Sequence, residues 1–417
     1  MKHLQPAAHI KSSTNLTLGW LVVLGIILVA ANQRAPITSV GPLISYIRES
    51  TGISNTVAGM LTTVPLLAFA FMSPFAPKLA RRYGTERVIF SALIFLFLGT
   101  VCRSLHGAGT LFAGTILIGL AISVCNVLIP SLVKRDFSHQ VGLMTGVYSV
   151  SMNLCGALAS GISIPLARDA GFGWQGALVC WCMMTILAMI SWFPRLRNTK
   201  PATAVVTVVA NDKKPNLWRS KLAWQVTAFM GLQSIIFYML AAWLPEILVS
   251  RGMSEDVGGW MLSLLQFSML PFTLLVPIIA GRMRNQRPLV LLTAVLYLLG
   301  IGGLFMNTNA LVPLCAIIIG IAGAFSFTLA MIFFSLRTRT VQEAAELSGM
   351  AQTVGYIMAA IGPMLFGWLH DITGTWDLPL MLLIVASLLI FAFGMGAARN
   401  RFVNSQESEP TEKYSVS

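Results

Sequence analysis

Charged residues are scarce in this chain. Of its 417 residues, 10% are charged and 56% are hydrophobic, whereas a water-soluble domain usually carries about 25% charged and about 45–50% apolar residues. So few charges cannot cover a soluble surface, and we predict an integral membrane protein. In a membrane protein, the formal net charge of +13 reflects mainly which side of the membrane holds the basic residues. We therefore expect no nucleic-acid partner.

The chain has only one long polar segment between its apolar stretches, at 195–221. Crossing about 30 Å of hydrocarbon takes roughly 20 mostly apolar residues in a helix, and twelve stretches meet that length. Their apolar runs are continuous rather than alternating, which favours helices over a β-barrel. We therefore predict an all-α integral membrane protein with twelve transmembrane helices. The spans run approximately over 17–47, 54–76, 87–103, 110–133, 141–167, 174–193, 222–248, 257–280, 288–306, 311–335, 345–369 and 378–397.

Groups that carry catalysis are missing from the spans. The five histidines lie in tails, loops or helix ends, and Glu246 is the only acid placed inside a span. No nucleotide-binding phosphate loop is present, which argues against ATP as the energy source. The six cysteines fall in or at the ends of spans, where thiols usually pack as small apolar groups. We expect no metal, no cofactor, no disulfide and no enzymatic activity.

The basic residues are distributed unevenly between the two sides of the membrane. With the N-terminus inside, 23 of the 28 fall in cytoplasmic segments; Arg48, Arg103, Arg168 and Arg251 fall outside, and Arg34 lies within a span. Short cytoplasmic segments carry an excess of Lys and Arg. We therefore predict a multi-pass protein of the cytoplasmic membrane with both termini in the cytoplasm and the lipid bilayer as its surroundings.

An internal repeat divides the spans into six and six. At a shift of 200 residues, Gly52, Ser54, Val57 and Gly59 fall on Gly252, Ser254, Val257 and Gly259, and Pro77, Ala80, Arg82 and Arg87 fall on Pro277, Ala280, Arg282 and Arg287. Parallel repeats of this kind build transporters with two moving halves. We predict bundles at 17–194 and 222–397, a cytoplasmic linker at 195–221, cytoplasmic tails at 1–16 and 398–417, and function as a monomer.

Several motifs resemble the major facilitator superfamily. The segment PKLARRYGTER at 77–87 is similar to that superfamily's GxLADRxGRR loop, although Pro77 replaces the first glycine and Arg81 the acidic residue. NQRAPITSVGP at 32–42 and NVLIPSLVKRDF at 126–137 resemble its cyanate permease group, and LAWQVT at 222–227 and LSGMAQTVGY at 347–356 its 2-nitroimidazole transporter branch. The resemblance implies gating by residues of the cytoplasmic loops, namely Gly84 and the basic residues Arg81, Arg82, Arg87, Lys134, Arg135 and Arg282.

Arg34 is the first candidate for a substrate-binding residue, because it lies near the middle of the first span. A cation there costs at least about 2.5 kcal/mol, and no carboxylate is predicted at its depth. One interpretation is a structural role, in which Arg34 donates to carbonyls freed by Pro36 and to the hydroxyls of Thr38 and Ser39. The other, which we favour, is that the guanidinium binds an anionic or acceptor-rich solute.

Polar and aromatic side chains in six spans accompany Arg34. Taken singly, each of them is better explained by a hydrogen bond between helices than by contact with a solute, but together they predict a wet central cavity. The candidate substrate-binding residues are Asn32, Arg34, Thr38, Asn126, Tyr148, Asn153, Gln233, Tyr238, Gln266, Gln352 and Tyr356.

These features predict a secondary transporter that moves a small-molecule substrate by alternating access, either actively or passively. The family resemblance implies a cyanate-like or nitroimidazole-like solute, whose acceptor atoms suit a guanidinium. Two alternatives stay open: a membrane receptor or sensor with the same fold, and a drug efflux permease of broader specificity.

Overall fold

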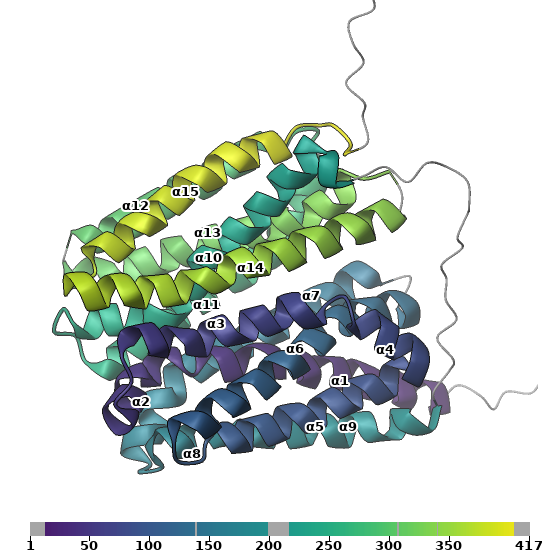
Figure 1. The fold of residues 1–417 in the computed structure, drawn as a ribbon. Coiled ribbons are helices and arrows are strands. Elements are labelled where there is room, and N and C mark those ends of the chain that lie inside the picture. Colours follow the sequence, from purple (N-terminus) through teal and green to yellow (C-terminus); the bar gives the residue numbers. More distant parts are fainter. Residues whose placement is uncertain (1–12, 138–139, 199–216, 307, 340, 404–417) are drawn as a thin grey trace, which may run out of the picture.

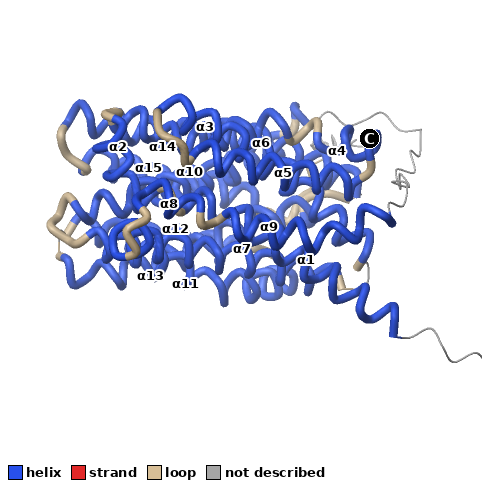
Figure 2. Tube along the Cα trace, turned by 90° about the horizontal axis from the view of Figure 1, so that it is seen from below, coloured by secondary structure: helices blue, strands red, loops and turns tan. Residues whose placement is uncertain are grey.

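The computed structural model describes residues 13–137, 140–198, 217–306, 308–339 and 341–403. Its described segments are helices and loops (Figure 2), and twelve helical segments are long and apolar enough to cross a membrane. The predicted twelve-helix architecture is therefore confirmed. Large apolar side chains such as Phe95, Leu299 and Leu388 are exposed on these helices, as expected for surfaces that hydrocarbon covers.

We call the first six spans and their connections the N-half and the last six the C-half. The N-half contains α1 (Ser13–Thr38), α2 (Ile44–Thr51), α3 (Asn55–Met72), α4 (Ala76–Tyr83), α5 (Thr85–Arg103), α6 (Ala108–Asp136), α7 (Val141–Ile164), α8 (Gly173–Val179) and α9 (Cys182–Trp192). The C-half contains α10 (Lys221–Val249), α11 (Glu255–Arg282), α12 (Arg287–Phe305), α13 (Val312–Leu336), α14 (Val341–Thr373) and α15 (Asp377–Ala397).

Two spans of the N-half are built from more than one helix. In the first, α1 ends at Thr38 and a short 3-10 turn at Gly41–Leu43 leads into α2. In the sixth, a break at residues 180–181 separates α8 from α9. The helix α4 lies in the segment between the second and third spans, where the sequence indicated only a loop.

The repeated residues have equivalent structural roles in the two halves. Gly52 and Gly252 both follow a helix end with a positive φ, of +70° and +81°, a conformation that side chains other than glycine adopt at a cost. Ser54 and Ser254 then cap α3 and α11, because each side chain accepts a hydrogen bond from the backbone N–H three residues later. The sequence repeat therefore preserves the turn that starts these two helices.

The two halves differ in how closely they meet at the two ends of the molecule. We call the end where Asn198 and Leu217 lie the linker face, and the other end the opposite face. Helices α3 and α14, and likewise α7 and α11, pack against one another across the halves. The halves diverge toward the linker face (Figure 1). At the opposite-face side, a Cβ added to Gly41 would lie 2.1 Å from the carbonyl oxygen of Ala241, so only glycine allows this approach.

Arg103, which the sequence placed in an outer loop, is buried at the end of α5 with 2% of its surface exposed. Its Nη1 donates to the carbonyl oxygen of Pro36 at 2.6 Å. That oxygen lacks its usual helical partner, because the N–H of Val40 bonds to Ile37 as α1 ends. The break in the first span therefore supplies one acceptor for the buried guanidinium, whose Nε and Nη2 have no partner among the described residues.

Candidate functional site

A cavity of about 140 Å³ lies between the halves near the middle of the spans. Eight helices contribute to it: α1, α3, α6 and α7 from the N-half, and α10, α11, α13 and α14 from the C-half. Its polar and aromatic lining residues are Gln33, Arg34, Phe69, Asn126, Tyr148, Gln233, Ser234, Phe237, Tyr238, Phe327, Gln352 and Tyr356, and Pro130, Met152, Met269, Gly323 and Met331 complete the wall.

Arg34 supplies the positive charge of this cavity and is 8% exposed. Its Nη2 donates to Asn153 Oδ1 at 3.1 Å, and its guanidinium carbon lies 3.9 Å from the centroid of the Phe237 ring. Its Nε is buried without a hydrogen-bond partner among the described residues. The guanidinium is thus held by one amide and one aromatic face, with the side chain of Tyr238 also beside it, and its Nε donor is unused.

The backbone of α7 makes room for Arg34. A Cβ added to Gly156 would lie 2.5 Å from Arg34 Cγ, closer than two carbon atoms can approach. The Thr38 hydroxyl lies 3.2 Å from the carbonyl oxygen of Arg34 and 3.0 Å from that of Gly156. Thr38 therefore ties α1 to α7 beside the arginine and does not itself line the cavity.

Tyr148 organises the N-half wall of the cavity. Its hydroxyl donates to Gln33 Oε1 at 2.6 Å and also lies 3.2 Å from Asn126 Oδ1. Gln33 was not among the residues that the sequence suggested, although it stands directly beside Arg34. Its buried Nε2 has no partner among the described residues, so it is a second unused donor at the site.

Aromatic rings and amides form the C-half wall. Gln233 Nε2 donates to Ser234 Oγ at 2.7 Å, and Gln352 Nε2 donates to Ser348 Oγ at 2.8 Å. The rings of Phe237 and Tyr238 meet edge to face at 5.2 Å. Tyr356 contacts Phe69 of the N-half at 5.5 Å in the same geometry. This wall therefore offers flat apolar surface next to neutral hydrogen-bonding groups.

Three more of the suggested binding residues lie outside the cavity lining. Asn32 Nδ2 donates to the carbonyl oxygen of Leu28 at 2.7 Å, and its Oδ1 accepts from Thr185. Gln266 Nε2 donates to Gly156 and Ser160, which joins α11 to α7. Asn153 is buried behind the cavity and holds Arg34. In the structure, these side chains connect helices.

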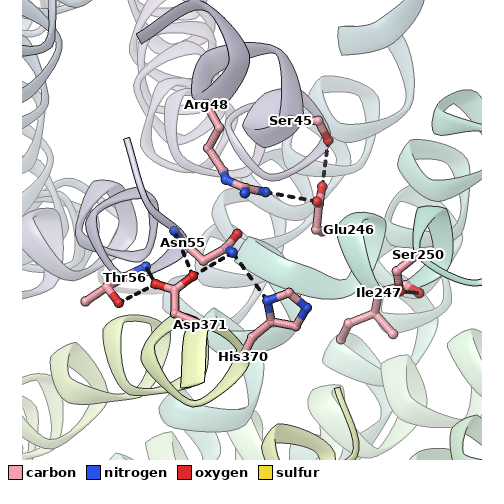
Figure 3. Close-up of polar contacts among 9 residues, drawn as sticks. All are labelled: Ser45, Arg48, Asn55, Thr56, Glu246, Ile247, Ser250, His370 and Asp371. Carbon is pink, nitrogen blue, oxygen red and sulfur yellow. Dashed lines mark hydrogen bonds and ion pairs between the residues drawn. The ribbon is translucent and has the colours of Figure 1, made fainter. Parts of the chain in front are cut away.

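The cavity carries no opposing charge. Among the described residues that line it, none is Asp, Glu or His. Glu246, the one acid that the sequence placed in a span, lies instead near the opposite face. There it accepts from Arg48 at 3.2 Å and from Ser45 at 2.6 Å (Figure 3). The arginine in the cavity thus has no carboxylate partner there.

Asp371 makes a second polar contact between the halves at the opposite face. From the end of α14 its carboxylate accepts the backbone N–H of Thr56 at 2.7 Å and that of Asn55 at 3.3 Å, both at the start of α3 (Figure 3). A carboxylate is favoured there because the first N–H groups of a helix have no partner within the helix. Arg168 and Asp256 make a third contact, at 2.6 Å.

These contacts define which side is closed. From the opposite face, hydrogen bonds between the halves continue as far as Thr63 in α3 and Gln266 in α11. The structure is therefore sealed at the opposite face.

The sequence profile of the Major Facilitator Superfamily matches residues 22–363 and 232–415 of the chain. The chain belongs to this superfamily. Members of the superfamily are transporters and not enzymes, and the twelve spans make this one a multi-pass membrane protein.

Relatives of this major facilitator include the 2-nitroimidazole transporter of Escherichia coli (strain K12), 40% identical over 91% of this chain and 96% of the relative. The transporter YycB of Bacillus subtilis (strain 168) is 44% identical over 94% and 96%, and the cyanate transport protein CynX of E. coli is 26% identical over 91% and 98%. These similarities fit the cyanate permease family. The D-xylose–proton symporter structure has the same fold, with a TM-score of 0.73 at 14% identity, over 93% of this chain and 97% of that one.

In this major facilitator, the basic residues suggested for gating make no ion pair across the halves among the described residues. Arg81, Arg82, Arg87 and Arg282 are exposed, and Gly84 starts α5 with a φ of +91°. The side chain of Lys134 lies outside the described residues. Arg135 pairs within the N-half, with Glu86 at 2.5 Å and with Asp136 at 2.7 Å.

Proposed function

We propose that this major facilitator carries a small solute with an anionic or strongly accepting group, and that Arg34 binds this group. The observation that supports it is the partly unused guanidinium in a cavity whose described lining contains no acid. Burying a cation without a counter-charge is costly. A bound acceptor would supply the missing hydrogen bonds, and a planar guanidinium suits two acceptor atoms at once.

The size of the cavity favours a small solute over a broad range of drugs. Its volume of about 140 Å³ compares with about 30 Å³ for each molecule of liquid water, and pockets for drug-sized ligands span roughly 300–1,000 Å³. Cyanate and 2-nitroimidazole, which appear in the names of two relatives, are both small and rich in acceptors. The rings of Phe237, Tyr238 and Tyr356 also suit a flat heterocycle.

The distribution of basic residues supports an orientation with the linker face and both termini in the cytoplasm. In that orientation the protein lies in the cytoplasmic membrane, and the structure is closed toward the outside. Transport then requires the bundles at 17–194 and 222–397 to rock, so that the contacts of Asp371 and Glu246 open while the linker face closes. The site near the middle of the spans stays between the moving halves.

Flux measurements on the purified protein test the proposal. Proteoliposomes loaded with unlabelled cyanate or 2-nitroimidazole are diluted into labelled solute, and exchange is followed against protein-free vesicles. We expect saturable exchange of at least one of the two solutes, with competition by the other. Thermal stabilisation by a solute without any flux would instead support a sensor, and the absence of both effects would reject these solutes.

A further inference from the structure

A second hollow lies at the linker-face end of α3, away from the central cavity. This surface groove of about 390 Å³ is lined by α3, α4 and the turn between them, with Phe71, Phe75, Lys78, Arg82 and Tyr83 among its residues. Both views place α4 at that end of the molecule, on the same lateral side as α3 and α6 (Figures 1 and 2). The groove thus lies at the linker-face end of the N-half.

The walls of the groove are aromatic and unusually exposed. Phe71 is 66% exposed, Phe75 43% and Tyr83 51%. Phe71 lies in the last turn of α3, Phe75 precedes α4, and Tyr83 ends α4, so the aromatic surface continues past the end of the apolar span. Tyrosine is enriched where a span meets the headgroup region. Such a surface suits acyl chains and the glycerol backbone of a lipid better than a water-soluble anion.

Two cations stand in the same groove. Lys78 Nζ lies 5.5 Å from the centroid of the Phe75 ring, and Arg82 Cζ lies 5.3 Å from that of Tyr83. No acid lines the groove, and among the described residues neither cation forms an ion pair. Glu86, the acid that follows in sequence, is buried and paired with Arg135. The positive charge in the groove is thus available to an external anion.

We propose that this groove binds an anionic phospholipid, with its phosphate between Lys78 and Arg82 and its chains against Phe71 and Phe75. Basic residues on an amphipathic helix at the membrane surface attract anionic headgroups. The proposal does not depend on the solute that the central cavity carries, because the groove shares no lining residue with that cavity.

The internal repeat provides a matched comparison. At the equivalent place in the C-half, α11 continues to Arg282, and the loop that follows contains Arg284 but neither a helix like α4 nor an aromatic residue. This loop has similar charge without the aromatic residues of the groove. If lipid binding needs both the cations and the aromatic walls, the N-half should bind the lipid and this loop should not.

The test is native mass spectrometry of the full-length protein in detergent, titrated with phosphatidylglycerol and, separately, with phosphatidylethanolamine of the same chains. We expect the first phosphatidylglycerol to bind about thirtyfold more tightly than phosphatidylethanolamine, which corresponds to two favourable cation contacts. The Lys78→Gln/Arg82→Gln variant should lose this preference. The Arg282→Gln/Arg284→Gln variant should keep it.

Two further measurements complete the test. Phe71→Ser/Phe75→Ser should weaken phosphatidylglycerol binding although both cations remain, and glycerol 1-phosphate, which has no chains, should not compete for the site. Equal affinity of the unmodified protein for the two lipids would overturn the proposal. So would equal losses in the Lys78/Arg82 and Arg282/Arg284 variants, or competition by glycerol 1-phosphate, which would indicate a site for free phosphate groups.

Discussion

The guanidinium of Arg34 in α1 stacks on the ring of Phe237 in α10, with 3.9 Å between Cζ and the ring centroid. Arg34 belongs to the N-half and Phe237 to the C-half, so the charge proposed to hold the solute also touches the opposite half. A solute bound to the edge of the guanidinium would lie against both halves. Their relative movement can therefore depend on whether the site is occupied.

Replacement of Phe237 by Leu should weaken solute binding by about two- to thirtyfold, because a cation–π contact contributes roughly 0.5–2 kcal/mol and here also orients the guanidinium. Phe237→Tyr keeps an aromatic face and should bind normally. The dissociation constant from thermal-shift or calorimetric titration of the solute gives the answer. An unchanged constant in Phe237→Leu would mean that the ring does not position Arg34 for binding.

Gly156→Ala should impair transport, because its new Cβ would lie 2.5 Å from Arg34 Cγ and from Gln266 Oε1. Overpacking of this kind costs about 1–3 kcal/mol, and the Arg34 side chain has to move to relieve it. We expect at least a tenfold loss in the ratio of transport rate to KM in proteoliposomes. Gly302→Ala is the control, since nothing lies within 4 Å of its added Cβ, and it should transport normally.

Asp371→Asn should favour opening at the opposite face. The change removes the negative charge that accepts the N–H groups of Asn55 and Thr56 at the start of α3, a class of hydrogen bond that contributes about 1.5–3 kcal/mol when not exposed. Since Asp371 is exposed, we expect a shift of about tenfold or less in the ratio of closed to open molecules.

Spin labels on Glu49 and Thr375, in a background without the six cysteines, measure this shift as a distance distribution across the opposite face. The longer distance should gain population in Asp371→Asn. Asp377→Asn removes an exposed acid of the same face that has no hydrogen bond to the N-half among the described residues, and it should leave the distribution unchanged. Identical distributions for all three proteins would remove Asp371 from the seal.

Asp136 should stabilise the N-half at neutral pH, and this stabilisation should be lost in acid. Burial acts to raise the pKa of Asp136, but hydrogen bonds and positive charges from Arg135 and Arg195 outweigh it and hold this pKa below its usual value. The stabilisation is therefore present above the unfolded-state pKa of about 3.9 and is lost as the pH falls through the lower, folded-state pKa.

Asp136→Asn should consequently lower the Tm at pH 7 by about 1–2 °C, since the partly exposed network contributes about 1 kcal/mol. The difference from the unmodified protein should shrink when the pH falls below about 4. Thermal unfolding in detergent at several pH values measures both effects. A difference in Tm that persists at the lowest pH would show that the side chain acts through packing and not through its charge.

Much of the architecture could be predicted because the bilayer fixes the length of each span and the repeat duplicates its turns. The number of spans and the correspondence of Ser54 with Ser254 followed from these constraints. Arg103 could not be placed, because its burial depends on an unpaired carbonyl at Pro36. The eight-residue helix α4 was too short and too polar to be distinguished from a loop in the sequence.

The central site could be predicted in part, because polar residues are conspicuous in apolar spans. Arg34, Asn126, Tyr148 and Gln352 line the cavity, whereas Asn32 has the same chemistry but points to α9. Such side chains differ only in the direction they face, which depends on the packing of several helices. The sequence offered Phe237 only as one aromatic residue of span 7 among 23 phenylalanines, and the packed structure is needed to show that its ring covers the arginine.

Replacement of Arg34 by Lys tests the central claim most directly. Lysine keeps the charge but offers a single ammonium instead of a planar fork. Counterflow of cyanate and 2-nitroimidazole should fall at least tenfold in both Arg34→Lys and Arg34→Ala, whereas the exposed Arg399→Ala control should keep the rate of the unmodified protein. Exchange at that same rate in Arg34→Ala, with unchanged protein content in the vesicles, would contradict the assignment of Arg34 as the residue that binds the solute.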